Sequence, residues 1–488
     1  MAGQTKTIQR EGTATPPPLA IELRDVSKSF GTVQANRNIN LKVEAGSIHG
    51  IVGENGAGKS TLMNILYGLH TADSGEILIN GEPVSIRSSA DAIACGIGMV
   101  HQHFMLVPNF SVLENVMLGS EGGMSLKKGR TDTLQSLTDL ANEYGMKVDP
   151  DALIEDLPVG TRQRVEIIKA MRGGARILIL DEPTGVLTPQ EADSLFEILR
   201  VLKSRGVTVL LITHKLGEIM AITDNVSIIR DGTVVGHRRT RETSTGELAE
   251  LMVGREVLLT VDRGTPKPAE TRLSVRNLGC TGQGGVPLLH DVSLEIRSGE
   301  ILGIAGVAGN GQTELLEALS GMRKPDTGSI DVLGNRIDPT LSRTPAQMRE
   351  LGVGHIPEDR HHHGLVLNFE ASENMVFGFH RNALSGDGIL LNADRMTAHC
   401  RTQMDQYDIR PRNPGLDARN FSGGNQQKIV IAREMHAEPG VLIVGQPTRG
   451  VDIGAIEFIH KQLIALRDRG CAILLVSVEL DEILGLSD

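Results

Sequence analysis

The sequence is duplicated, and the duplication limits what each half can fold into. Residues 41–53, which end in Gly-Ile-Val-Gly, match residues 294–306, which end in Gly-Ile-Ala-Gly. Residues 177–184 match residues 441–448 in the same way. The offset grows from 253 residues (294 minus 41) to 264 residues (441 minus 177), which indicates an insertion in the second copy. Each copy is therefore expected to form one domain.

Within each copy, short runs of Ile, Leu and Val alternate with longer stretches of helical periodicity. This alternation predicts an α/β fold in which a mostly parallel sheet is flanked by helices. Between the copies the chain turns polar and passes through Arg263-Gly-Thr-Pro-Lys-Pro, which is typical of a linker. We therefore expect four segments: a disordered tail at residues 1–18, a first domain at 19–239, a linker at 240–271 and a second domain at 272–488.

The two copies differ in where they stop. The first continues past His214 through a further apolar segment at residues 226–235, whereas the second reaches Asp488 soon after Val478. The second domain is therefore expected to lack one terminal hairpin, either through natural clipping or because the chain has been shortened.

Charge and composition exclude several classes of protein. A net charge of -11 provides no basic field for nucleic acid, so we expect no nucleic-acid partner. No run of 18 uninterrupted apolar residues occurs, so the chain itself is not expected to cross a membrane. The four cysteines lack C-x-x-C spacing, which speaks against zinc or a disulfide framework. Residues 361–363 are three successive histidines, and we interpret them as a solvated loop because adjacent side chains do not converge as metal ligands do.

The first copy contains a phosphate-binding loop. Residues 53–60 fit the pattern G-x-x-x-x-G-K-[ST] and lie between an apolar strand and a helix, which is the context the motif requires. Backbone N–H groups at the start of that helix are expected to surround the phosphates of ATP, with Lys59 neutralising their charge and Ser60 binding Mg²⁺. The expected nucleotide-binding residues of this loop are Gly53, Asn55, Gly56, Gly58, Lys59, Ser60 and Thr61.

Further candidates stand at the ends of other predicted strands. Asp181 and Glu182 follow the run Ile-Leu-Ile-Leu, and we expect Asp181 to hold Mg²⁺ and Glu182 to act as general base. His214 also ends a strand, where it is expected to orient the attacking water. Gln102 lies between a strand and a loop, as a sensor of Mg²⁺ would. Phe30 is either a platform for adenine or a core residue.

A second motif lies in the other half of the chain. Residues 421–427 read Phe-Ser-Gly-Gly-Asn-Gln-Gln, a phosphate-sensing signature that begins a helix. The ordered set of loop, Gln, signature, Asp-Glu and His resembles the ATP-binding cassette family across nearly the whole chain. This resemblance implies two RecA-like P-loop domains, each with an antiparallel β-subdomain and a helical subdomain. It also implies an intramolecular pseudo-dimer that closes head to tail, with each ATP between one loop and the opposite signature.

The two copies carry complementary defects. In the second copy the catalytic positions hold Gln312 for Lys, Glu358 for Gln, Gly445 for Asp, Gln446 for Glu and Val478 for His. In the first copy Pro158 replaces the signature serine, and Thr188 stands where the second copy has Asp452. We therefore expect one hydrolytic site, in which the first copy's residues face Ser422, Gly423, Gly424 and Asp452. The other site is expected to hold nucleotide or to be a structural contact.

Among cassette proteins, residues 101–108 and Asn310-Gly-Gln312 resemble the fused ATPases of bacterial simple-sugar and nucleoside importers, with the nucleoside branch favoured. Such a protein would lie peripherally on the cytoplasmic face of the membrane. Its partners would be two integral-membrane permease subunits and, through them, an extracytoplasmic substrate-binding lipoprotein. Import of simple sugars such as pentoses or galactosides is the alternative. An alternative of another class is a soluble twin-cassette ATPase that acts on ribosomes or DNA.

Overall fold

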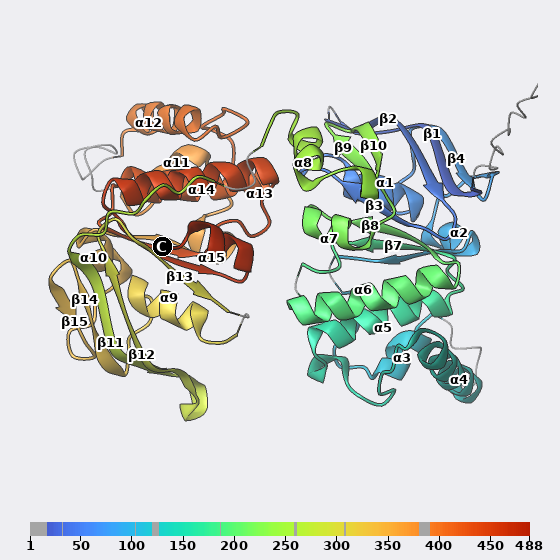
Figure 1. Cartoon of the computed structure of the whole chain (residues 1–488), viewed down its shortest axis with the longest axis horizontal. Coiled ribbons are helices and arrows are strands. Elements are labelled where there is room, and N and C mark those ends of the chain that lie inside the picture. Colours follow the sequence, from blue (N-terminus) through green and yellow to red (C-terminus); the bar gives the residue numbers. More distant parts are fainter. Residues whose placement is uncertain are drawn as a thin grey trace, which may run out of the picture. The chain divides into compact units, whose positions relative to one another are not determined.

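The computed structural model describes residues 17–31, 33–102, 104–119, 126–185, 187–257, 261–306, 309–379 and 391–488. Two compact units make up the chain, Met1–Gly254 and Arg255–Asp488 (Figure 1). Both are mixed α/β structures, as the sequence predicts. Among the described residues, none of the helices combines the length and the apolar character needed to cross a bilayer.

The first unit is organised around a sheet with the strand order β10-β9-β3-β8-β7-β6. The pairs between β9, β3, β8, β7 and β6 are parallel, and β10 pairs antiparallel with β9. The strands are β3 (Ile48–Val52), β6 (Ile97–Val100), β7 (Ile177–Asp181), β8 (Thr208–Ile212), β9 (Asn225–Arg230) and β10 (Thr233–Arg239). Because the carboxyl ends of parallel strands meet at one edge, the loops after β3, β6, β7 and β8 all begin there.

A smaller antiparallel sheet and a helical subdomain complete this unit. The sheet has the order β2-β1-β4-β5, built from β1 (Leu19–Phe30), β2 (Val33–Glu44), β4 (Ser74–Ile79) and β5 (Glu82–Val84). The helical subdomain comprises α3 (Val112–Met117), α4 (Leu126–Tyr144) and α5 (Val159–Arg172). The remaining helices are α1 (Lys59–Leu66), α2 (Ser89–Ala94), α6 (Pro189–Ser204), α7 (Leu216–Ile222) and α8 (Thr245–Val253), with single turns at Ile154–Asp156 and Thr240–Glu242.

The continuous apolar runs form the parallel strands because both faces of the sheet are covered. On β7, Ile177 and Ile179 face a core shared with β1, β2 and α1, whereas their neighbours Leu178 and Leu180 point to the opposite face. Figure 1 shows α1 and the small sheet on one side of the parallel strands and α5 and α6 on the other. All five residues of β7 are buried. Because both faces of the sheet are covered, the polar residues that follow the strands are held in place at its carboxyl edge.

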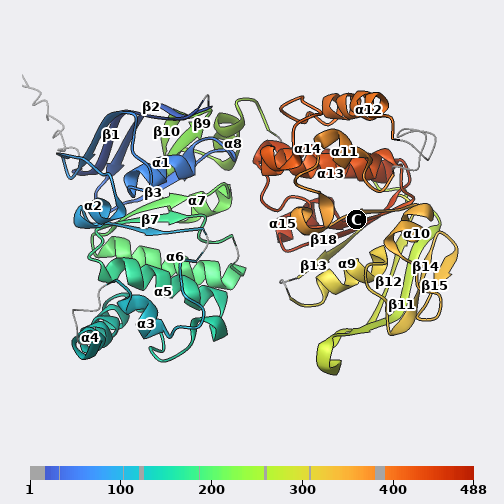
Figure 2. The same ribbon diagram turned by 180° about the vertical axis from the view of Figure 1, so that it is seen from behind.

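The second unit repeats the plan (Figure 2). Its described residues form an antiparallel sheet, β12-β11-β14-β15, and a parallel sheet, β13-β18-β17-β16. The strands are β11 (Thr271–Thr281), β12 (Pro287–Arg297), β13 (Ile301–Ala305), β14 (Thr327–Val332), β15 (Asn335–Ile337), β16 (Val353–Ile356), β17 (Val441–Gly445) and β18 (Ala472–Ser477). The helices are α9 (Gln312–Ser320), α10 (Pro345–Glu350), α11 (Ala371–Val376), α12 (Ala393–Gln406), α13 (Gly423–His436), α14 (Ile453–Asp468) and α15 (Leu480–Leu486), with short turns at Gln283–Gly285, Arg360–Gly364 and Ala418–Asn420.

The observed boundaries refine the predicted segments. The boundary between the units falls after Gly254, inside the predicted linker, because α8 buries Leu248, Ala249 and Met252 and packs against β9. The tail predicted at 1–18 lies, up to residue 16, outside the described residues, and β1 begins at Leu19. Among the described residues, the second parallel sheet has no counterparts of β9 and β10.

A charged clasp is repeated in both units. In the first, Lys203 lies 2.6 Å from Asp224, whose other carboxylate oxygen accepts a hydrogen bond from the Ile48 amide on β3. In the second, Arg467 lies 2.8 Å from Asp488, whose other oxygen accepts from the Ile301 amide on β13. Lys203 and Arg467 are related by the 264-residue offset, as are the two aspartates. The clasp therefore ties the end of a long helix to the strand that leads into the phosphate loop.

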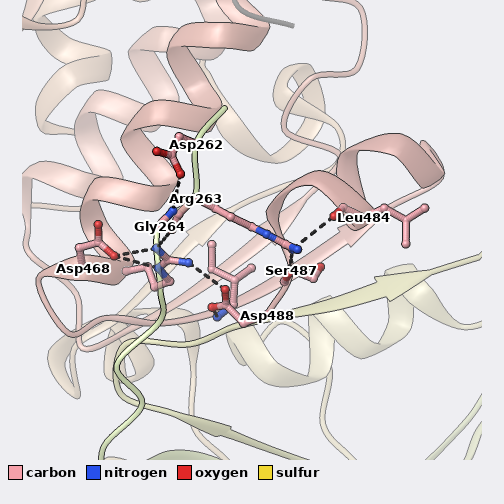
Figure 3. Close-up of polar contacts among 9 residues, drawn as sticks. Asp262, Arg263, Gly264, Asp468, Leu484, Ser487 and Asp488 are labelled. Atoms are coloured by element: carbon pink, nitrogen blue, oxygen red, sulfur yellow. Dashed lines mark hydrogen bonds and ion pairs between the residues drawn. The ribbon is translucent and has the colours of Figure 1, made fainter. Parts of the chain in front are cut away.

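The two clasps differ in burial. Figure 3 shows residues 262–264 running over the second clasp, where Arg263 reaches Leu484 and Ser487. The carbonyl of Arg263 also accepts a hydrogen bond from Arg467. As a result the Arg467 and Asp488 side chains are 1% and 7% exposed, against 37% and 36% for Lys203 and Asp224. Part of the predicted linker thus serves as the cover of a buried ion pair.

We predict that Arg467→Met destabilises the second unit by about 3–5 kcal/mol, because the carboxylate of Asp488 is left buried without its partner. Lys203→Met is the matched control in the first unit, with an expected change of at most about 1 kcal/mol, since that pair is exposed to solvent. Scanning calorimetry of the full chain, with the unfolding transitions of the two units resolved, measures both. Equal losses in the two variants would contradict this account.

Candidate functional site

The phosphate-binding loop of the first unit is held by close backbone packing. Gly58 has φ +100° and ends the loop directly before α1. A Cβ atom at this position would lie 2.3 Å from the carbonyl oxygen of Ala35, so only glycine fits. Asn36, which is fully buried, donates its side-chain amide to the Gly58 carbonyl at 3.1 Å. No sequence pattern pointed to Asn36, because its role depends on β2 passing beside the loop.

The polar groups of the loop are arranged to accept an anion. Lys59 is 5% exposed and donates to the carbonyls of Gly53 and Glu54 at 2.7 and 2.9 Å. Ser60 and Gly56 are exposed, and Gly56 has φ +82°. The first N–H groups of α1 have no partner within the helix, and the positive end of the helix dipole lies among them. Asn55 and Thr61, also predicted as nucleotide-binding, lie in the same loop and in the first turn of α1.

Glu182 is the centre of the carboxylate site. It follows β7 directly, and its backbone has φ +47°, a conformation that non-glycine residues adopt rarely and mainly where surrounding structure enforces it. Its amide donates to the Ile212 carbonyl at 2.9 Å. Gln102 donates to one carboxylate oxygen at 3.0 Å, and His214 Nδ1 lies 2.9 Å from the other. The ends of three strands thus bring together the three residues predicted as catalytic.

Burial and neighbouring charges separate the pKa values of the two adjacent carboxyls. Burial and the charge of Glu182 raise the pKa of Asp181, with Ser60 and Lys59 opposing the rise. Burial would also raise the pKa of Glu182, but the hydrogen bond and charge of His214 outweigh it, and the pKa is lowered. Glu182 is therefore ionised at neutral pH and able to accept a proton. Asp181 and Ser60 offer the oxygen ligands that Mg²⁺ prefers.

Gln446 of the second unit corresponds to Glu182. It has the same backbone conformation but no titratable side chain. Gln446 has φ +47° and donates its amide to the Val476 carbonyl at 2.8 Å, which repeats the geometry of Glu182. Its side-chain carbonyl accepts from the amide of Val478 at 3.2 Å. Neither Gln446 nor Val478 titrates, so this unit has no counterpart of the ionised Glu182 and its histidine.

The signature of the second unit is assembled at the start of α13. Ser422 caps this helix, and its hydroxyl accepts from the side chain of Asn425 at 2.8 Å. A Cβ atom at Gly424 would lie 2.7 Å from a carboxylate oxygen of Asp452, so the two predicted residues are packed together. Asp452 itself caps α14 through the Ala455 amide at 2.7 Å. Gly423 lies beside them in the first turn of α13.

In the first unit the equivalent helix is α5, and a carboxylate lies against its first turn. Pro158 caps α5 without a side-chain hydrogen bond. The carboxylate of Glu191 accepts from the Gly160 amide at 3.1 Å, and the same side chain completes a capping box with Thr188. Backbone hydrogen bonds, chiefly from Thr188, lower the pKa of Glu191 and keep it ionised. The Gly160 amide at this helix start is thus already hydrogen-bonded to a fixed negative charge. The capping-box spacing predicts the Thr188 contact, but not the contact with Gly160.

The structure also gives the surroundings of Phe30 and of the histidines at residues 361–363. Phe30 is 44% exposed, at the end of β1, with its ring 5.1 Å from that of His70, so it is not a core residue. His361 bonds to Gln426 at 2.8 Å, and Asp359 accepts from the amides of His361 and His362. Among the described residues, no group of three or more His, Cys, Asp or Glu side chains is placed to hold a metal ion.

Two segments of the chain match a single family model. Residues 36–185 and 289–449 each match the model described as ABC transporter, and these segments contain the phosphate loops, the strand-end carboxylates and the signature. The chain belongs to the ABC transporter family. It is an ATP-binding protein with two cassettes, which confirms the predicted family and fold class.

Curated relatives match nearly the whole chain. The nucleoside import ATP-binding protein NupA of Lactococcus lactis subsp. cremoris is 45% identical, over 96% of this chain and 92% of that protein. The guanosine import ATP-binding protein NupO of Bacillus subtilis is 46% identical, over 96% and 91%. The glucose import ATP-binding protein TsgD13 of Haloferax volcanii is 43% identical, over 96% and 90%.

We predict that Gly58→Ala abolishes nucleotide binding by the first cassette, because the added methyl group meets the Ala35 carbonyl and the positive φ disfavours alanine. Gly217→Ala, in α7, is the control, since nothing lies within 4 Å of its added Cβ. Filter binding of radiolabelled ATP measures both variants. Binding by Gly58→Ala at the wild-type level would contradict the packing argument.

Proposed function

We propose that the protein is the ATP-hydrolysing subunit of a membrane importer of nucleosides. The observation that carries the hydrolytic part is the position of Glu182, ionised and held between Gln102 and His214. The import part rests on the relatives, because the proteins named as nucleoside and guanosine importers are 45% and 46% identical over 96% of the chain. Sugar import is the second candidate, since a glucose import protein is 43% identical over the same share.

In the proposed mechanism the first cassette supplies the chemistry. The amides around Gly58 and the ammonium group of Lys59 would bind the phosphates, and Ser60 and Asp181 would hold Mg²⁺, which would supply charge neutralisation. Glu182 accepts the proton of the attacking water, and His214 and Gln102 fix the orientation of its carboxylate. Phe30, exposed at the end of β1, would stack on adenine.

The second cassette would contribute its signature. When nucleotide is bound, we expect the cassettes to close head to tail, so that Ser422, Gly423 and Gly424 donate to the γ-phosphate and Asp452 supports them. The complementary defects support this arrangement, since each cassette keeps the half of the site that the other has lost. On this proposal one ATP is hydrolysed per closing event, at the site that contains Glu182.

The proposed partners follow from the importer assignment. An ATP-binding subunit acts on permease subunits, and we propose two of them in the membrane, with a substrate-binding lipoprotein outside. The protein would associate peripherally with the cytoplasmic face of that membrane.

We predict that Glu182→Gln lowers ATP turnover by about 100-fold or more, because the general base is lost while the hydrogen bonds to the amide remain. ATP binding is expected to stay near the wild-type level. The matched variant is Gln446→Glu, which places a carboxylate on the same backbone turn of the second cassette. It is expected to add no turnover, because Val478 and Gly445 provide neither histidine nor aspartate.

Phosphate release by the purified chain, with nucleotide binding measured in parallel, tests this assignment. Near-normal turnover in Glu182→Gln would refute the role of Glu182. A gain of turnover in Gln446→Glu would refute the proposal that only the site containing Glu182 hydrolyses ATP.

We predict that cells lacking this chain lose uptake of radiolabelled nucleosides and keep uptake of pentoses and galactosides. Re-expression of the wild type restores uptake, and re-expression of Glu182→Gln does not, because transport needs hydrolysis. Loss of sugar uptake alone would favour the second candidate. Loss of neither would contradict the importer assignment.

A further inference from the structure

A carboxylate outside the predicted catalytic set connects the segments that follow Glu182 and His214. Glu218 lies in the first turn of α7, and its amide donates to the Lys215 carbonyl at 3.1 Å. The hydroxyl of Thr184, which lies on the loop after Glu182, donates a hydrogen bond to Glu218 Oε1. Thr184 is 3% exposed, so this hydrogen bond is shielded from water. A side-chain contact therefore joins the loop after β7 to the helix after β8.

A second buried hydroxyl group acts on the same carboxylate. Thr213, which directly precedes His214, is 2% exposed. Burial raises the pKa of Glu218, and the hydroxyl groups of Thr184 and Thr213 oppose the rise. One of these hydroxyl groups lies on the loop after Glu182 and the other at the end of the strand that leads to His214. Because His214 Nδ1 lies 2.9 Å from Glu182, the contacts form a closed ring that contains the general base and the histidine.

The second cassette keeps the carboxylate with a different partner. Glu482, related to Glu218 by the 264-residue offset, lies in the first turn of α15. Its carboxylate lies 3.0 Å from Nε2 of His460 on α14. Across the described residues, this is the side-chain hydrogen bond that Glu482 makes. The equivalent position on α6 of the first cassette is Phe196, which offers no polar atom. The contact with the loop after the strand is therefore found in the cassette that keeps a general base.

We propose that Glu218 is a positioning residue for ATP hydrolysis, which holds the histidine of the site against the general base. It does so by joining Thr184, on the loop after the base, to the helix that begins after the histidine. A displacement of a catalytic group by about 1 Å can lower a rate about 100-fold, so the distance between these two loops matters for the reaction. The inference rests on the proposed role of Glu182 as general base.

The contact acts on the chemical step and not on nucleotide binding. The phosphate loop follows β3 and is supported by Asn36 of β2. Thr184 and Glu218 lie after β7 and in α7, so their contact supports other segments of the cassette. Loss of the contact is therefore expected to lower kcat while KM for ATP stays unchanged, which is the pattern of an interaction used only in the transition state.

The test measures steady-state ATP turnover by the full chain. Glu218→Leu fills the space without accepting a hydrogen bond, and we expect kcat to fall at least about 10-fold with KM for ATP within about twofold of the wild type. Glu218→Gln keeps an acceptor oxygen at the same reach, so its kcat should stay within about threefold of the wild type. Thr184→Val removes the same hydrogen bond from the other side and should lower kcat to a similar extent. Combining Thr184→Val with Glu218→Leu should cause no further loss, because both variants remove one interaction.

Glu482→Leu is the matched control, because it removes the equivalent carboxylate from α15, and its kcat should equal that of the wild type. The proposal is overturned if Glu218→Leu keeps the wild-type kcat, or if Glu482→Leu lowers kcat as much. It is equally overturned if Glu218→Gln loses as much turnover as Glu218→Leu, or if kcat and KM worsen together, since the residue would then not act through this hydrogen bond.

Circular dichroism establishes whether each variant is folded. If Glu218→Leu is not folded, Thr184→Val decides by the same criteria. Glu182→Gln, measured in parallel, tests the proposed function separately. Near-normal turnover in Glu182→Gln would refute the proposed function, whereas its loss there together with normal turnover in Glu218→Leu would refute this inference alone.

Discussion

The left-handed backbone turn after β7 is the constraint on which the site depends. At Glu182 the chain leaves β7 with φ +47°, and its amide is bonded to the end of β8. This turn directs the side chain between Gln102, which follows β6, and His214, which follows β8. The second cassette keeps the turn at Gln446 although the carboxylate is gone. The strained geometry is thus a property of the fold, and the chemistry depends on which side chain stands on it.

Much of the fold and of the first site could be predicted because the decisive signals are local. The strand, loop and helix around Lys59 are contiguous in sequence, and the residues after β7 and β8 had to meet because parallel strands end at one edge. The positions of Glu182, His214 and Gln102 followed from that rule. The packing of Gly424 against Asp452 agrees with the grouping expected from their motifs.

Other features depend on contacts between distant segments, which no local pattern encodes. Asn36 supports the phosphate loop from β2, 22 residues away. Glu358 lies in the space beside Gly445 only because β16 pairs with β17. The segment predicted as a linker is polar, but its first part forms α8, and residues 262–264 run over the ion pair of Arg467 and Asp488. The polar composition of this segment could not predict that it packs over an ion pair.

The contact of Glu191 with Gly160 changes what the first cassette's defect means. A carboxylate attached to the same chain is always present at a high effective concentration, so an incoming phosphate must displace it. Restoring the serine at Pro158 would leave this internal competitor in place. The defect of this helix start therefore lies in the hydrogen bond between Glu191 and Gly160 as well as in the missing serine hydroxyl.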